Sequence, residues 1–86
     1  MTTPTRVTKE ALLAKIAAAD YVVMPDGRTT VCQLTMQNGF TVVGESACAS
    51  PANFNAEIGR QIAWENAVDK VWPLMGYELR SKLAAA

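Results

Sequence analysis

An Asn-Gly pair between two short runs of alternating apolar and polar residues is the feature that most constrains the fold of this chain. Asn38-Gly39 accepts the positive φ angles that a two-residue type I′ turn requires. The residues on either side, 31–37 and 40–45, have the composition of strands. The pattern therefore predicts a β-hairpin whose turn is Asn38-Gly39.

A two-residue turn also predicts the register of the hairpin, because Gln37 then pairs with Phe40. In this register Leu34 faces Val43, and side chains alternate between two faces of the sheet. The face expected to lie against a helix carries Cys32, Leu34, Met36, Thr41, Val43 and Glu45. The opposite face carries Val31, Gln33, Thr35, Gln37, Phe40 and Val42.

Two further elements are predicted before the hairpin. Thr8 can cap a helix over residues 9–19, whose apolar side chains recur at helical spacing. Residues 21–24 form a short β-prone run, which the turn signal at 25–27 ends. Together with the hairpin, this run predicts a three-stranded meander.

After the hairpin, the sequence predicts mainly helix. Ser50-Pro51 provides a capping hydroxyl and a proline at the first helical position of a helix over 51–72. Pro73 and Gly76 interrupt it, and residues 77–83 form a short helix or a strand. The predicted fold class is α+β: an N-terminal helix, a three-stranded antiparallel meander with an Asn-Gly hairpin, a long helix and a short C-terminal helix.

Length and charge limit the functions that the chain can have. Eighty-six residues predict a single domain over 1–86, in which 84–86 resemble a cloning scar. Eight basic and eight acidic residues leave no net charge, which argues against nucleic-acid binding. No apolar run approaches a membrane span, and residues 1–5 lack the pattern of a signal peptide. We therefore expect a cytosolic protein that does not bind a membrane.

The two cysteines predict neither a disulfide nor a metal site. In the predicted register Cys32 and Cys48 lie on opposite faces of the hairpin, so they should not bridge. The chain contains no His, and two thiols make only half a zinc site. We expect both to be small hydrophobic residues, and we expect no metal and no cofactor.

One side of the long helix is a stripe of small residues. Such a stripe lets another backbone approach closely, and we expect the bulky side of the helix to lie on the sheet. Two covers for the stripe are weighed equally: a second copy, which would make a homodimer, and the helix at 9–19. The candidate interface residues are Ala52, Ala56, Gly59, Ala63 and Ala67.

A polar ridge follows the same helix, with members four residues apart: Glu57, Gln61, Glu65 and Asp69. Simple exposure is the favoured interpretation, ahead of a cation site or a catalytic pair formed by Glu65 and Asp69. General acid–base catalysis also needs a shaped pocket and stabilising donors, and no nucleophile motif or phosphate loop accompanies the ridge. The chain is therefore predicted not to be an enzyme.

Aromatic and amide side chains provide a second candidate surface. Trp64 and Trp72 lie about two turns apart on the long helix and can line one groove. They are core residues or, alternatively, a platform for a small organic ligand or a protein. The candidate binding residues are Gln33, Thr35, Gln37, Phe40, Trp64, Trp72 and Tyr77.

Four ordered blocks resemble a known family. They are residues 38–47, 53–59 and 65–67, and the series Trp72-Pro73-Leu74 with Gly76, Tyr77 and Leu79. The blocks resemble small phage proteins of the family named for the gene forty-nine and gene sixty-six products of two enterobacterial phages. The resemblance covers about 29–80, and residues before Val22 take no support from it.

The resemblance implies a phage or prophage gene expressed in a bacterial cytoplasm, and it transfers no catalytic residue. We therefore expect an accessory protein that binds a host protein or sequesters a small host molecule. A structural or assembly role in the phage is the alternative. A small enzyme that uses Glu65 and Asp69 is the third hypothesis.

Overall fold

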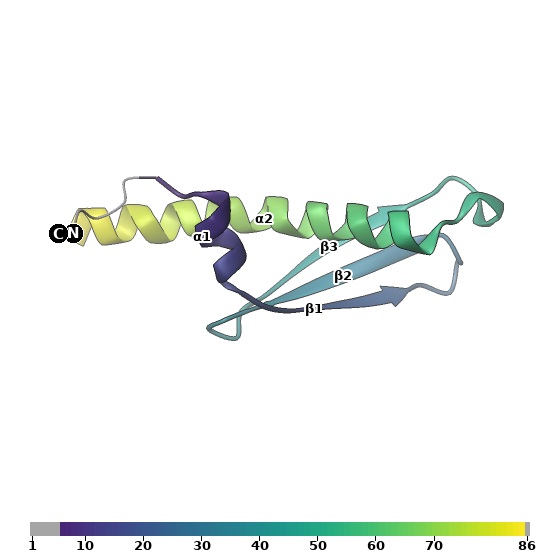
Figure 1. Ribbon diagram of the computed structural model, residues 1–86, viewed down its shortest axis with the longest axis horizontal. Helices are drawn as coiled ribbons and strands as arrows, with labels where there is room; N and C mark the ends of the chain where they lie inside the picture. The colour runs from purple at the N-terminus through teal and green to yellow at the C-terminus, as the bar shows by residue number, and fades with distance from the viewer. Residues whose placement is uncertain (1–5, 86) are drawn as a thin grey trace.

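Three antiparallel strands form the sheet of this protein. A computed structural model describes residues 6–85 and places β1 (Ile16–Val23), β2 (Thr29–Met36) and β3 (Thr41–Ala47) side by side in chain order. Each strand pairs with the next one along the chain, as Figure 1 shows. The predicted meander and the α+β class are therefore confirmed.

The hairpin turn contains three residues, and the predicted register is wrong by one residue. A two-residue type I′ turn needs positive φ at both central positions, but only Gly39 has it, with φ 89°. The Met36 N–H donates to the Phe40 carbonyl over 2.8 Å, so these two residues close the loop. The Asn38 side chain accepts the Phe40 N–H over 2.9 Å. Because that local hydrogen bond favours the longer loop, Leu34 faces Val42.

This shift changes which face of β3 is buried. Cys32, Leu34 and Met36 are buried on β2, as predicted. On β3, however, Val42 and Gly44 lie on the buried face, while the predicted Thr41, Val43 and Glu45 are exposed. A slip of one residue moves every side chain of a strand to the other face, which accounts for the whole error.

Both cysteines are free thiols, but the reason differs from the one predicted. The Cys48 N–H donates to the Arg28 carbonyl, so Cys48 continues the observed register and lies on the same face as Cys32. Four residues separate the two positions along the strand, which corresponds to about 13 Å. Distance therefore keeps the thiols apart, and burial raises the pKa of Cys32.

The first helix is shorter than predicted. α1 spans Lys9–Ala14, and the Thr8 hydroxyl caps it by accepting the Ala11 N–H over 3.2 Å, as expected. Residues 16–19, predicted as helix, instead begin β1 and pair with the end of β2. Alanine has the highest intrinsic helix propensity, but such propensities are small compared with tertiary interactions. Pairing with β2 and contacts of Ile16 and Ala19 with the core therefore outweigh it.

A single long helix replaces the two predicted after the sheet. Ser50 caps a short 3₁₀ helix, η1 (Pro51–Asn53), and Asn55 then caps α2 (Ala56–Ala85) by accepting the Ile58 N–H. α2 continues through Pro73, where a break was predicted. Pro73 and Asp69 are both exposed, so water can bond the Asp69 carbonyl that the missing N–H leaves free. Ala84 and Ala85 belong to α2, whereas Ala86 and residues 1–5 lie outside the described residues.

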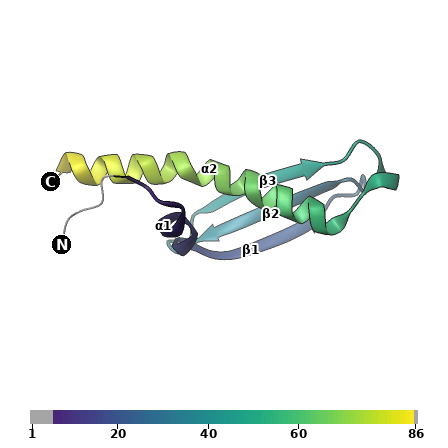
Figure 2. The ribbon, with the colours of Figure 1, turned by 45° about the horizontal axis from the view of Figure 1, so that its top comes forward.

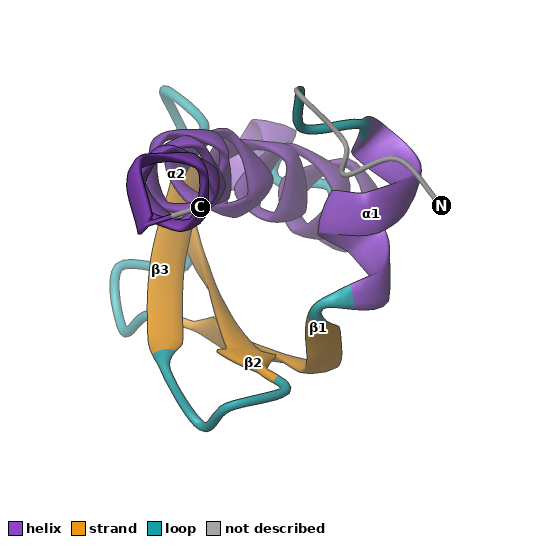
Figure 3. Ribbon diagram, turned by 90° about the vertical axis from the view of Figure 1, so that its left-hand side faces the viewer, coloured by secondary structure: helices purple, strands orange, loops and turns teal. Residues whose placement is uncertain are grey.

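α2 packs across β3 and β2 on one face of the sheet, and α1 lies beside it over the start of β1 (Figures 2 and 3). The closest approach is at Gly44 in β3. A Cβ there would overlap the backbone of Ala63 and Ala67, which are fully buried. The core around this contact consists of Leu12, Cys32, Leu34, Met36, Val42, Ala63, Ala67, Val68 and Val71.

α2 also covers the outer edge of β3. The Lys70 ammonium donates to the Val43 carbonyl over 2.7 Å, and the Asn66 amide donates to the Glu45 carbonyl over 2.8 Å. A 30-residue helix is about 45 Å long, compared with about 27 Å for an eight-residue strand. The last turns of α2 therefore extend past the sheet (Figure 1).

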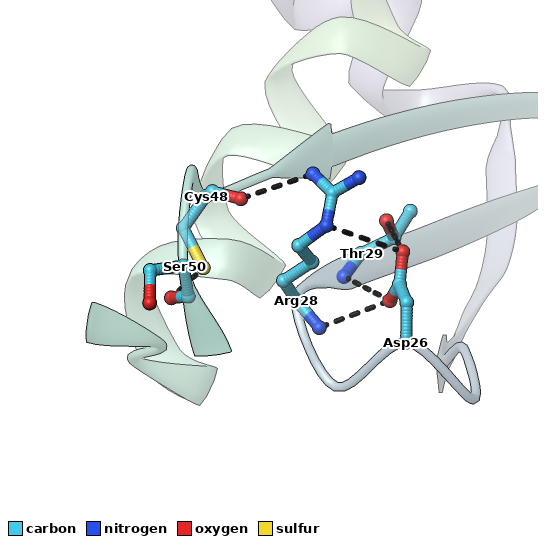
Figure 4. A network of polar contacts seen from close by, with 5 residues as sticks. All are labelled: Asp26, Arg28, Thr29, Cys48 and Ser50. Atoms are coloured by element: carbon cyan, nitrogen blue, oxygen red, sulfur yellow. Dashed lines mark hydrogen bonds and ion pairs between the residues drawn. The ribbon is translucent and has the colours of Figure 1, made fainter. Parts of the chain in front are cut away.

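The β1–β2 turn is held by one carboxylate (Figure 4). Asp26 accepts the Thr29 hydroxyl over 2.7 Å and the backbone N–H groups of Arg28 and Thr29 over 3.0 Å each. The Arg28 guanidinium reaches the Cys48 carbonyl over 3.2 Å, which links this turn to the end of β3. The Thr29 hydroxyl, followed by the Arg28 N–H, lowers the pKa of Asp26.

Gly44→Ala should destabilise the protein by about 3 kcal/mol, because the new methyl group forces two backbones apart. Gly76→Ala is the matched control. A Cβ at Gly76 meets no atom within 4 Å, so this change should stabilise α2 by about 0.5–1 kcal/mol through helix propensity. Urea denaturation measures both. Equal changes in the free energy of unfolding for the two variants would contradict the close contact at Gly44.

The register predicts different outcomes at two neighbouring valines of β3. Val42→Ala should cost about 2 kcal/mol because Val42 is 7% exposed, whereas Val43→Ala should cost about 0.5 kcal/mol or less because Val43 is 43% exposed. Chemical denaturation of both variants tests this. A larger cost for Val43→Ala than for Val42→Ala would instead support the register of the two-residue turn.

Asp26→Asn should lower stability at neutral pH and have a smaller effect in acid. A carboxyl whose folded pKa is lowered stabilises the fold above its unfolded pKa, and this contribution is lost as the pH falls through the folded value. The unfolding free energies of wild type and variant, measured with urea, should therefore approach each other as the pH falls below 3.8, the ordinary value, and converge below the lowered folded value. A difference in unfolding free energy that stays constant across pH would show that the carboxylate charge has no role in the turn.

Candidate functional site

A pocket of about 280 Å³ lies between the tip of the β2–β3 hairpin and α2, and we name it the hairpin-tip pocket. Five of its nine lining residues are apolar. Three segments of the chain contribute: the junction of α1 with β1, the hairpin, and the part of α2 around Pro73. The lining residues are Lys15, Met36, Gln37, Asn38, Phe40, Val71, Leu74, Met75 and Glu78.

Backbone hydrogen bonds hold the walls of this pocket together. The Gln37 N–H donates to the Lys15 carbonyl over 2.7 Å, which joins the hairpin tip to the end of α1. The Gly39 N–H donates to the Met36 carbonyl over 2.9 Å and closes the loop. The pocket is therefore built on a fixed turn and a helix, which favours a preformed binding site.

The pocket has an apolar rim and one charge of each sign. Val71 is fully buried at its base, whereas Phe40 and Leu74 remain 55% and 44% exposed. Lys15 contributes an ammonium group and Glu78 contributes a carboxylate. The Glu78 carboxylate also lies 3.5 Å from the ammonium of Lys82, one helical turn later. A partner with an apolar anchor and flanking polar groups matches this lining.

A second pocket, the tryptophan pocket, lies on another side of α2. Its volume is about 350 Å³, and Trp64 and Trp72 both line it, so the two rings share one groove as predicted. Both tryptophans are half-buried and pack against the core. α1 contributes Lys9, and the remaining lining residues are Glu65, Val68 and Asp69.

The polar ridge on α2 is exposed at all four positions, in agreement with the favoured interpretation. The Gln61 amide donates to the Glu65 carboxylate over 3.4 Å. Glu65 and Asp69 line the tryptophan pocket together with Lys9, a basic residue that the sequence did not associate with them. Among residues 6–85, no group of three or more possible ligands is placed to hold a metal.

The predicted binding residues do not form one surface. Gln37 and Phe40 line the hairpin-tip pocket, and Trp64 and Trp72 line the tryptophan pocket. Gln33 and Thr35 lie on the face of the sheet away from α2, where they pair with Val43 and Thr41. Tyr77 is exposed on the part of α2 that extends past the sheet. Two separate candidate sites therefore replace the single platform.

The small-residue stripe of α2 lies against the chain's own sheet. Ala63 and Ala67 are buried against Gly44, and a Cβ at Gly59 would lie 2.7 Å from the Thr30 hydroxyl oxygen. Only Ala52 and Ala56 are exposed. The prediction that a second copy or α1 covers the stripe is therefore wrong for Gly59, Ala63 and Ala67.

Sequence reasoning missed the residues that α1 and the second half of α2 bring to the pockets. Lys9 and Lys15 lie on or just after α1, a position that depends on how α1 folds back beside α2. Leu74, Met75 and Glu78 become one wall only because α2 continues through Pro73. The helical spacing of Val71, Leu74, Met75 and Glu78 was the available signal.

Comparison with known proteins places the chain in a family. Its sequence matches the model of the phage protein family named for N4 Gp49 and phage Sf6 gene 66 over residues 7–83. This range includes α1 and β1, for which the resemblance had given no support. No curated protein and no solved structure matches the chain. Among its described helices, none has the length and apolar character needed to cross a membrane. Because the match covers most of the chain, the protein belongs to the N4 Gp49/Sf6 gene 66 family of phage proteins.

Proposed function

We propose that this phage protein is a non-enzymatic accessory protein that binds a host protein through the hairpin-tip pocket. Family membership supports a phage-associated role. The observation that carries the proposal is the apolar rim of the pocket, where Phe40 and Leu74 leave about half of their surface exposed. The site of action would be the cytoplasm of the host bacterium.

The form of the pocket favours a protein partner over a small molecule. Protein interfaces bury aromatic and aliphatic anchors in a central patch surrounded by polar groups. Phe40 and Leu74 provide such anchors, and Lys15, Gln37 and Glu78 provide the polar surroundings. Because hydrogen bonds hold the hairpin tip in place, a partner that inserts one apolar side chain meets a preorganised surface.

Sequestration of a small host molecule is the second candidate, and the tryptophan pocket favours it. Two indole rings can stack on a flat organic ligand. Lys9 can then pair with an anionic group, or Glu65 and Asp69 with a cationic one. The same two carboxylates are the residues on which the enzyme hypothesis depends. Assembly within the phage particle remains a further alternative role.

Capture from host extract tests the proposal with two matched changes on α2. Leu74→Lys places a charge on the pocket rim and should abolish capture of the partner protein. Ile62→Lys is the control, because Ile62 is 41% exposed on the same helix but outside both pockets. This variant should retain capture. Circular dichroism should show that both variants fold.

The outcome also separates the candidate sites. Loss of capture with Ile62→Lys, but not with Leu74→Lys, would contradict the hairpin-tip pocket. If Glu65→Gln combined with Asp69→Asn abolishes the biological effect in infected cells while Leu74→Lys leaves it intact, the tryptophan pocket is the functional site. Binding through the hairpin-tip pocket would then be wrong.

A further inference from the structure

The helix α2 covers one edge of the sheet but not the other. At the outer edge of β3, Lys70 and Asn66 of α2 bond the carbonyls of Val43 and Glu45. β1 forms the other edge, away from α2 (Figure 1). Within residues 6–85, no helix or strand pairs with that edge. An edge strand without cover is a template for pairing with another chain.

The orientation of the backbone shows which groups of β1 point outward. The Met24 N–H donates to the Thr29 carbonyl over 2.8 Å, so position 24 directs its groups toward β2. In an antiparallel pair these directions alternate along the strand, so Ala19, Tyr21 and Val23 direct their N–H and C=O groups outward. These three residues are the hydrogen-bonding positions of the open edge.

The side chains of β1 favour an apolar partner strand. Ala19, Tyr21 and Val23 lie on the same face as the buried Cys32 and Leu34, because they neighbour these β2 positions. α2 covers β2 and β3, which leaves Tyr21 39% and Val23 47% exposed. The strand contains no Pro or Lys, and Asp20 is its one charged residue. The irregularity in its pairing lies between Ile16 and Ala18, so residues 19–23 have little of the protection that edge strands normally carry.

A second copy of the chain fits this edge in a register centred on Tyr21. With a two-fold axis at Tyr21, the outward groups of Ala19 bond those of Val23 in the second copy, and Asp20 faces Val22 of that copy. An axis at Asp20 would place two carboxylates opposite each other. An axis at Val22 would pair Ala19 with Pro25, which has no N–H.

We infer that the protein forms a two-fold symmetric dimer in which the β1 strands of two copies pair antiparallel through Ala19, Tyr21 and Val23. The resulting sheet has six strands, with both α2 helices on one face. Its two outer edges are the β3 strands, which α2 covers, so the assembly closes at two copies. The exposed Tyr21 and Val23 side chains of both copies then pack between the two helices. This surface is distinct from both pockets.

A charge exchange at Val22 tests the register. Val22 is 58% exposed, so the monomer should tolerate both Lys and Asp there. In the proposed dimer, residue 22 of each copy faces Asp20 of the other copy, so this pair occurs twice. Val22→Lys should therefore tighten the dimer about threefold to tenfold, and Val22→Asp should weaken it by a similar factor. Sedimentation equilibrium measures the dissociation constants, and thermal unfolding of both variants confirms equal folding.

Hydrogen exchange gives an independent measurement on the wild-type protein. The amides of Tyr21 and Val23 should become protected as concentration rises, while the outward amides of Val43 and Glu45 on β3 should not change. A wild type that stays monomeric at high micromolar concentration would overturn the inference, as would equal dissociation constants for the two variants. A dimer in which the Tyr21 and Val23 amides stay unprotected would use another surface. Protection that appears only with a host protein would identify a strand of that protein as the occupant, which also contradicts self-pairing.

Discussion

The contact between Gly44 in β3 and the backbone of α2 at Ala63 and Ala67 sets the position of every other element. A glycine facing two alanines lets the helix approach the strand more closely than any larger pair of residues would allow. The approach brings Asn66 and Lys70 within reach of the β3 carbonyls, where they replace a neighbouring strand. Since interiors are close-packed, one added methyl group at this contact affects the whole interface between helix and sheet.

The position of α2 over β3 and β2 leaves two parts of the molecule uncovered. At the edge of the sheet away from α2, β1 has exposed apolar side chains on the same face as the core. At the end of the sheet, α2 continues past the hairpin, and the hairpin-tip pocket lies between the hairpin and α2. Small domains bury only a modest share of their surface, so surfaces of this kind are common sites of association.

The two pockets differ in how firmly they are built. The hairpin-tip pocket is bounded by a loop whose residues 36–40 are tied by backbone and Asn38 hydrogen bonds, and by the fully buried Val71. The tryptophan pocket depends on α1, a helix of six residues that contributes Lys9. Short helices are stabilised mainly by tertiary contacts, so the geometry of this second pocket depends on how α1 rests against α2. This difference supports the proposal that a partner binds at the hairpin tip.

Local residue preferences specified much of this protein in advance. Thr8 capped a helix, Asn38-Gly39 formed a turn, the β2 alternation identified its buried face, and four sequence blocks indicated the phage family. Three features did not follow from these preferences. The exact loop length followed from the Asn38 bond to Phe40, the strand at 16–19 from pairing with β2, and the continuous α2 from exposure of Pro73. The small stripe shows the difference most clearly. Helical spacing placed Gly59, Ala63 and Ala67 on one face. Which surface covers Ala63 and Ala67 was decided by Gly44, about twenty residues away along the chain.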